Sequence, residues 1–135
     1  MNQGLSNEDR NALVKYRLER AHETVKEAEL MLSGNFYNAA INRLYYACFY
    51  AAEALLLANS ITARTHAGVR SMLGLHFISK GLISIDSGKT YGNLFEKRHS
   101  SDYDDFVYCD RELVEDLLPK ANSFIDEVSN LLTKN

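Results

Sequence analysis

The stretch FYNAAINRLYYACFYAAEALLLA, at residues 36–58, decides the fold of this chain. Placed on a helix with about 3.6 residues per turn, its apolar and small residues fall nearly all round the circumference. A helix of that kind is packed on several sides, and its alanines let neighbouring backbones approach closely. Arg43 and Glu53 count against a membrane span, because charges are costly in lipid. The stretch therefore predicts the central helix of a helical domain.

Amphipathic helices are predicted on both sides of this central helix. Apolar residues recur at spacings of three and four over residues 7–32 and again over residues 110–132. Ser6 and Asp110 are suitable N-caps for these two helices. Gly34 suits a left-handed position just after the first of them.

Two shorter helices are predicted between the central helix and the last one. One begins near His66, and the other follows a loop at residues 79–89. A strand is hard to place anywhere except at residues 82–85. Pro119 should bend the last helix or divide it in two. About five helices with short connections predict an all-α protein, a helical bundle.

The composition is that of one cytoplasmic domain, spanning residues 1–135. Neither a secretory signal nor an apolar run of membrane-spanning length is found. Cys48 and Cys109 lie outside any metal-binding spacing and are expected to be reduced thiols. The net charge is −3, yet residues 54–95 carry four basic residues and one acidic residue. That balance permits contact with a phosphate or an acidic partner without demanding one.

A first candidate site lies on the central helix. Asn38, Asn42, Tyr45 and Tyr46 recur at helical spacings, and Arg43 extends a neighbouring face. An Arg on an otherwise apolar helix needs a partner, because burying an unpaired charge is costly. In one interpretation Arg43 pairs with a carboxylate and the tyrosines fill the core. In the other, these residues form a polar pocket that binds phosphate or a partner.

A second candidate site is the segment from Arg98 to Tyr103. Arg98 and Asp102 are spaced as an i, i+4 pair on a helix, which in the plain interpretation is a surface ion pair. Arg98 also shares its helix face with large apolar residues, which directs it toward the core or an interface. In the functional interpretation Arg98 binds a phosphate, and His99 or Tyr103 donates or accepts a proton.

A third candidate is Arg64-Thr65-His66, at a predicted helix start. Thr65 and His66 either cap and pack this helix, as Thr often does, or His66 contributes to an anion site. The second interpretation uses the free backbone N–H groups that a helix N-terminus offers.

Three segments of the chain together resemble the HEPN domain family. They are Asn38-Ala-Ala-x-x-Arg43-x-Tyr45-Tyr46-Ala-x-Phe49, Thr65-His66-x-Gly68-Val69 and Arg98-x-x-x-Asp102-Tyr103. The similarity spans residues 9–131 and is greatest to small stand-alone members often encoded beside minimal nucleotidyltransferases. It implies an up-and-down helical bundle that forms a homodimer through its helices.

The resemblance also implies a chemistry. Many HEPN proteins are metal-independent ribonucleases of toxin–antitoxin or defence systems, in which an Arg is followed by His four to six residues later. There the Arg would steady the scissile phosphate while the His assists proton transfer. In this chain Arg98 carries over, but Tyr103 stands at the first such position, and His99 follows Arg98 directly.

The sequence therefore predicts a HEPN-like module that acts with a partner nucleotidyltransferase, binds nucleotide or RNA, or does both. Its binding residues would be Arg43, Tyr46, His66 and Arg98, with no metal and no cofactor. The alternative is a metal-independent ribonuclease toxin. Its catalytic residues would be Arg98, His99, Asp102 and Tyr103. A purely structural dimer, in which these residues only pack, is the third hypothesis.

Overall fold

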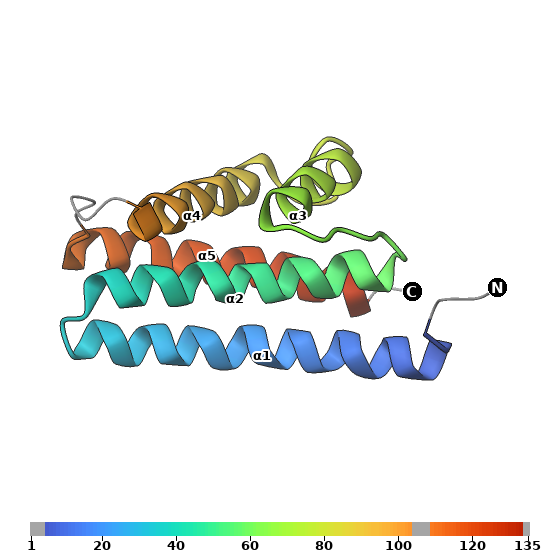
Figure 1. Ribbon diagram of the computed structural model, residues 1–135, viewed down its shortest axis with the longest axis horizontal. Helices are drawn as coiled ribbons and strands as arrows, with labels where there is room; N and C mark the ends of the chain where they lie inside the picture. Colours follow the sequence, from blue (N-terminus) through green and yellow to red (C-terminus); the bar gives the residue numbers. More distant parts are fainter. Residues whose placement is uncertain (1–4, 104–108, 134–135) are drawn as a thin grey trace.

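The computed structural model describes residues 5–103 and 109–133, with the side chains of residues 99–103 left out. Five α-helices and one π-helical turn, η1, make up these residues (Figure 1). In chain order they are α1 (Asn7–Ser33), α2 (Tyr37–Ala58), α3 (His66–Leu73), η1 (Gly74–Ile78), α4 (Ile85–Tyr103) and α5 (Arg111–Thr133). The predicted all-α helical bundle is confirmed.

Helix α2 lies at the centre of the bundle. It packs against α1, α3, α4 and α5, and Figure 1 shows it between α1 on one side and α4 on the other. Several alanines of α2 are completely buried, namely Ala40, Ala47, Ala51, Ala52 and Ala54. Because an alanine adds only a methyl group to the helix surface, the neighbouring helices can lie close to the α2 backbone. The predicted role of residues 36–58 as the central helix is thus confirmed.

The turn between α1 and α2 differs from its prediction in one residue. Ser6 caps α1 as expected, accepting a hydrogen bond from the backbone N–H of Asp9 at 3.0 Å. The left-handed residue, however, is Asn35, with φ +66°, while Gly34 has φ −91°. Asparagine tolerates this conformation, and its side-chain oxygen accepts a hydrogen bond from the Tyr37 hydroxyl at 3.0 Å. Gly34 is needed for space instead, because a Cβ there would lie 2.9 Å from the Phe36 ring.

Two arginines fasten the helix ends to their neighbours. Arg10 of α1 donates to the backbone carbonyl of Leu57, in the last turn of α2, at 3.3 Å. Arg111 of α5 donates to the carbonyl of Leu32, in the last turn of α1, also at 3.3 Å. Each carbonyl already accepts a hydrogen bond from a backbone N–H of the following turn, so the guanidinium adds a second donor. It also places a positive charge at the negative end of the helix dipole.

Helix α4 begins earlier than the sequence pattern indicates. The loop predicted at residues 79–89 ends before Ile85, and no strand forms at residues 82–85. Gly88, interpreted as a loop residue, is helical and gives η1 room to approach, since a Cβ there would lie 2.8 Å from Ile78.

Asp110 caps α5 as predicted, accepting from the Leu113 N–H at 2.9 Å. A division of α5 at Pro119 is wrong, because one helix runs through that residue.

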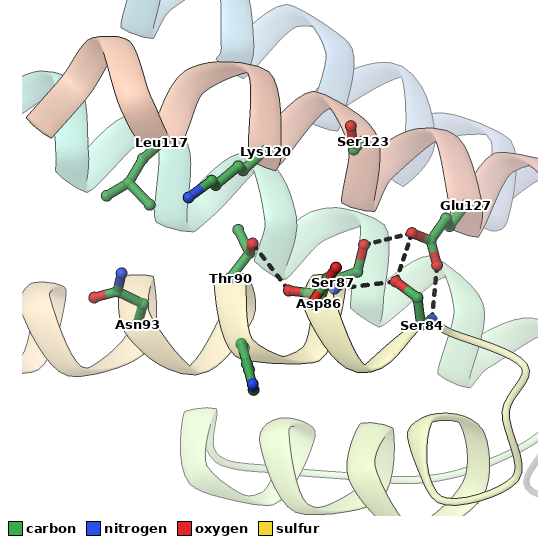
Figure 2. Close-up of a pocket in the computed structure, with 10 residues that line it drawn as sticks. Ser84, Asp86, Ser87, Thr90, Asn93, Leu117, Lys120, Ser123 and Glu127 are labelled. Carbon is green, nitrogen blue, oxygen red and sulfur yellow. Dashed lines mark hydrogen bonds between the residues drawn. The ribbon is translucent and has the colours of Figure 1, made fainter.

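The start of α4 is held to α5 by a carboxylate. Glu127 accepts hydrogen bonds from the Ser84 N–H at 2.8 Å, the Ser84 hydroxyl at 2.9 Å and the Ser87 hydroxyl at 2.5 Å (Figure 2). Partial burial by itself would raise the pKa of Glu127, but these hydrogen bonds outweigh it and lower the pKa. The charged form of Glu127 is therefore the one that holds α4 in place.

We predict that Glu127→Gln destabilises the protein at neutral pH and that the effect fades in acid. A carboxylate whose pKa is lowered by folding contributes stability above the ordinary Glu value of about 4.3, and this is lost as the pH falls through the lowered folded value. We expect a loss of about 1 kcal/mol at pH 7, measured by urea unfolding across pH 3 to 7.

The matched control is Asp126→Asn, which removes a neighbouring exposed carboxylate. This variant should follow the wild type at every pH. Equal stability of wild type and Glu127→Gln at neutral pH would contradict a stabilising role for the Glu127 contacts.

Candidate functional site

Arg98 of α4 and the two tyrosines of α2 form the centre of the candidate site. The Arg98 Nη2 donates a hydrogen bond to the Tyr46 hydroxyl at 2.8 Å. The guanidinium carbon lies 5.5 Å from the ring centroid of Tyr46 and 5.7 Å from that of Tyr45. Cation–π contacts of this kind orient a guanidinium on the ring faces. The Arg98 residue is half-buried, and its Nε atom is buried.

His66 joins this group from the first turn of α3. The Tyr45 hydroxyl lies 2.8 Å from His66 Nδ1, and the imidazole stacks on the Phe49 ring at 4.3 Å between centroids. Tyr45 is completely buried, and this burial raises the pKa of its phenol to about 12. Thr65 caps α3 by accepting from the Gly68 N–H at 2.8 Å, so the capping interpretation of Thr65 holds.

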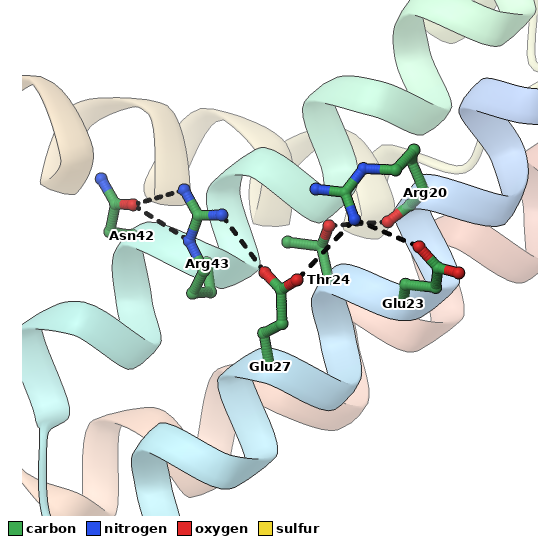
Figure 3. Close-up of polar contacts among 6 residues, drawn as sticks. All are labelled: Arg20, Glu23, Thr24, Glu27, Asn42 and Arg43. Atoms are coloured by element: carbon green, nitrogen blue, oxygen red, sulfur yellow. Dashed lines mark hydrogen bonds and ion pairs between the residues drawn. The ribbon is translucent and has the colours of Figure 1, made fainter.

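Arg43 has a carboxylate partner, as the first interpretation of the central helix expected. Its Nη1 lies 3.3 Å from Glu27 Oε1 of α1, and it also donates to the Asn42 side-chain oxygen (Figure 3). Arg20 reaches the same Glu27 carboxylate at 3.7 Å. Arg43 thus links α1 to α2. Its guanidinium carbon nevertheless lies 5.2 Å from the Tyr46 ring centroid, so Arg43 and Arg98 both contact that ring.

The Arg43, Arg98 and His66 contacts described above lie along a strip of half-buried aromatic rings on α2. It consists of Tyr46, Phe49 and Tyr50, spaced by three and four residues along one helix face. Arg20 adds a further guanidinium, 5.4 Å from the Tyr50 ring centroid. Half-exposed rings with arginines beside them are the surface on which single-stranded nucleic acids stack.

The side chains of three predicted catalytic residues are not described by the structure. His99, Asp102 and Tyr103 belong to α4, but their side chains lie outside the described residues. The structure therefore brings together Tyr46, His66 and Arg98, with Arg43 beside them.

A pocket of about 550 Å³ lies between α4 and α5, on a different face of α4 from Arg98. Figure 2 shows Asn93 and Lys120 on its opposite walls, with Glu127 near one end. The sequence analysis did not single out these residues. The only signal was the recurrence of Ser84, Ser87 and Thr90 every three residues, which the loop prediction obscured.

Three further properties bear on the kind of site. Across residues 5–103 and 109–133, excluding the side chains left out, no three His, Cys, Asp or Glu side chains gather as a metal site requires. None of the helices in that same part of the chain is both long enough and apolar enough to span a bilayer. Cys48 and Cys109 are both buried and form no disulfide.

Comparison with known proteins places this geometry in a family. A model of the HEPN domain matches residues 14–131. A UPF0332 protein of Thermotoga maritima is 34% identical over 92% of this chain and 94% of its own length. "Putative toxin MJ0605" of Methanocaldococcus jannaschii is 30% identical over 95% of each chain.

A solved structure has the same fold. The crystal structure of TT1696 from Thermus thermophilus superposes with a TM-score of 0.74 at 19% identity, covering 87% of this chain and 96% of the other. The HEPN match covers most of the residues, including helices α2, α3 and α4, which contribute Tyr46, His66 and Arg98. The chain therefore belongs to the HEPN domain family.

Proposed function

We propose that this HEPN domain binds the phosphodiester of RNA, or the phosphate of a nucleotide, at a site built from Tyr46, His66 and Arg98. In this proposal the ligand is bound and not cleaved. The observation that carries it is the position of Arg98, which is half-buried, hydrogen-bonded to the Tyr46 hydroxyl and seated on two tyrosine rings.

The chemistry of a guanidinium supports a phosphate ligand. It offers five N–H donors in a planar fork that matches two phosphate oxygens, and it stays charged at any physiological pH. The Tyr46 hydroxyl uses one of these donors. Because Tyr45 and Tyr46 hold the group in one orientation, little side-chain entropy is lost when an anion binds.

The aromatic strip supports a nucleic acid over a small inorganic anion. Tyr46, Phe49 and Tyr50 are each half-buried, so part of each residue is exposed to solvent. Base–aromatic stacking contributes about 1–3 kcal/mol per base and tolerates any sequence. A single-stranded RNA could place its phosphate at Arg98 and its neighbouring bases along the strip.

The biological setting is part of the proposal. Two relatives from Methanocaldococcus jannaschii are named putative toxins, which supports a role in a toxin–antitoxin or defence system of the cytoplasm. We extend the proposal to a homodimer and to a minimal nucleotidyltransferase as partner, as the family resemblance implies. Residues 54–95 carry more basic than acidic side chains, and this excess is compatible with a partner that is acidic or is a nucleic acid.

A second candidate function is metal-independent RNA cleavage. One observation favours it: the structure brings a histidine, His66, close to the tyrosines that hold Arg98. His66 could take the proton-transfer role that the missing spaced His has in the family motif, with Arg98 on the phosphate.

We predict that Arg98→Ala weakens RNA binding by about 10-fold or more, since hydrogen bonds to charged groups contribute roughly 1.5–3 kcal/mol. The measurement is fluorescence anisotropy of a labelled single-stranded oligoribonucleotide with EDTA present. The control is Lys120→Ala, which removes a positive charge from the α4–α5 pocket and should leave the affinity unchanged.

The same samples, run on a denaturing gel, separate the two functions. Intact RNA after incubation with wild type supports the binding module. Cleavage by wild type that disappears in Arg98→Ala would establish the ribonuclease instead. Equal affinity of wild type and Arg98→Ala would contradict a phosphate site at Arg98.

A further inference from the structure

Exposed apolar side chains gather where η1 leads into α4. Seven large apolar side chains are exposed among the described residues, and three of them fall within residues 75–85. They are Leu75 of η1, Leu82 of the connecting loop and Ile85 at the start of α4, with exposed fractions of 57%, 50% and 68%. Single exposed apolar residues are common, but a group of them marks an interaction site more often.

An open groove of about 500 Å³ adjoins these residues, between η1 and α4. Ile78 and Ile85 line its apolar part. Gly88 and Gly92, one turn apart on α4, line it as well. A Cβ at Gly88 would lie 2.8 Å from Ile78, and a Cβ at Gly92 would lie 2.7 Å from Arg70. The two glycines therefore let η1 and the Arg70 side chain lie directly against α4.

Positive side chains border the same groove. Arg70 lies across α4, with its guanidinium carbon 4.9 Å from the Phe95 ring centroid and its Nη2 3.5 Å from Glu96 Oε2. These contacts orient the guanidinium, although its side chain stays 41% exposed. Lys89 lines the groove and Lys80 lies in the loop after η1; both are exposed and form no ion pair within the described part of the chain.

The chemistry of this face favours an acidic protein as its occupant. Two copies of the chain placed face to face would bring the lysines of one against those of the other, and like charges oppose that association. Leucine and isoleucine side chains offer no ring on which a nucleic-acid base can stack. A lipid surface is flat, whereas a groove accommodates the apolar ridge of a single helix.

We propose that this groove binds an amphipathic segment of an acidic partner protein, whose apolar residues contact Ile85 and whose carboxylates pair with Arg70 and Lys89. Oriented arginines are frequent at the energetic centre of protein interfaces. The π-helical turn η1 beside the groove is a rare element that is found frequently at functional sites. The groove lies on a different face of α4 from Arg98, so the inference does not depend on the proposed phosphate site.

The first test is site-specific photo-crosslinking in the cells that naturally make the protein. A photoreactive amino acid is introduced at Ile85, and the control carries it at Leu30 of α1, which has the same exposed fraction of 68%. Mass spectrometry then identifies the crosslinked peptide. We expect position 85, and not position 30, to be joined to another protein. The joined segment should have apolar residues at helical spacing and more acidic than basic side chains.

The second test measures the charge pairing with a synthetic peptide that has the sequence of the crosslinked segment. Its binding to the purified protein is followed by fluorescence anisotropy. Lys89→Glu should weaken binding about 5-fold or more, because it places like charges opposite each other. The matched control is Lys26→Glu, which reverses the charge of an exposed lysine on α1 and should bind like wild type. Thermal unfolding of each variant confirms that it is folded.

Several outcomes would overturn the inference. They are a crosslink from position 85 to a second copy of this chain, to RNA or to lipid, a joined segment without an acidic excess, and no crosslink beyond the Leu30 control. Equal binding of the peptide to wild type and Lys89→Glu would contradict the pairing of carboxylates with this face. None of these results changes the expected effect of Arg98→Ala on RNA binding, so the two proposals fail separately.

Discussion

The structure depends on how closely α2 is packed. Its buried alanines add almost no bulk, so α1, α4 and α5 can approach its backbone from several directions. Close packing of this kind leaves little of α2 exposed. The residues that remain partly exposed include the strip formed by Tyr46, Phe49 and Tyr50. Arg20 of α1 lies beside the Tyr50 ring, and Arg98 of α4 lies beside the Tyr46 ring.

Two arginines that touch the same ring have different roles. Arg43 is paired with Glu27 and Asn42 and ties α1 to α2. Arg98 donates a hydrogen bond to the Tyr46 hydroxyl and lies beside the rings of Tyr45 and Tyr46, which orient its guanidinium. Arg43 thus links two helices of the bundle, whereas Arg98 is the residue on which the proposed phosphate site is built.

Local sequence signals predicted much of the fold and less of the site. The caps at Ser6 and Asp110 and the all-round apolar pattern of residues 36–58 are local, so these elements were foreseen. The start of α4 was missed because Ser84 is held by Glu127, which lies 43 residues away in the chain. The contact of Tyr45 with His66 likewise spans 21 residues and a loop, and no spacing rule reveals it. The half-buried position of Arg98 was foreseen, since it shares a helical face with Tyr91 and Leu94, both of which are buried.

The most direct test of the account is to map where RNA contacts the protein. Nitrogen-15 labelled protein would be titrated with a single-stranded 2′-O-methyl oligoribonucleotide, following the backbone signals of every helix and the side-chain signal of Arg98. The account predicts that the changes gather at Tyr45, Tyr46, His66 and Arg98. Changes gathered instead at Asn93, Lys120 and Glu127, in the pocket between α4 and α5, or no changes at all, would contradict it.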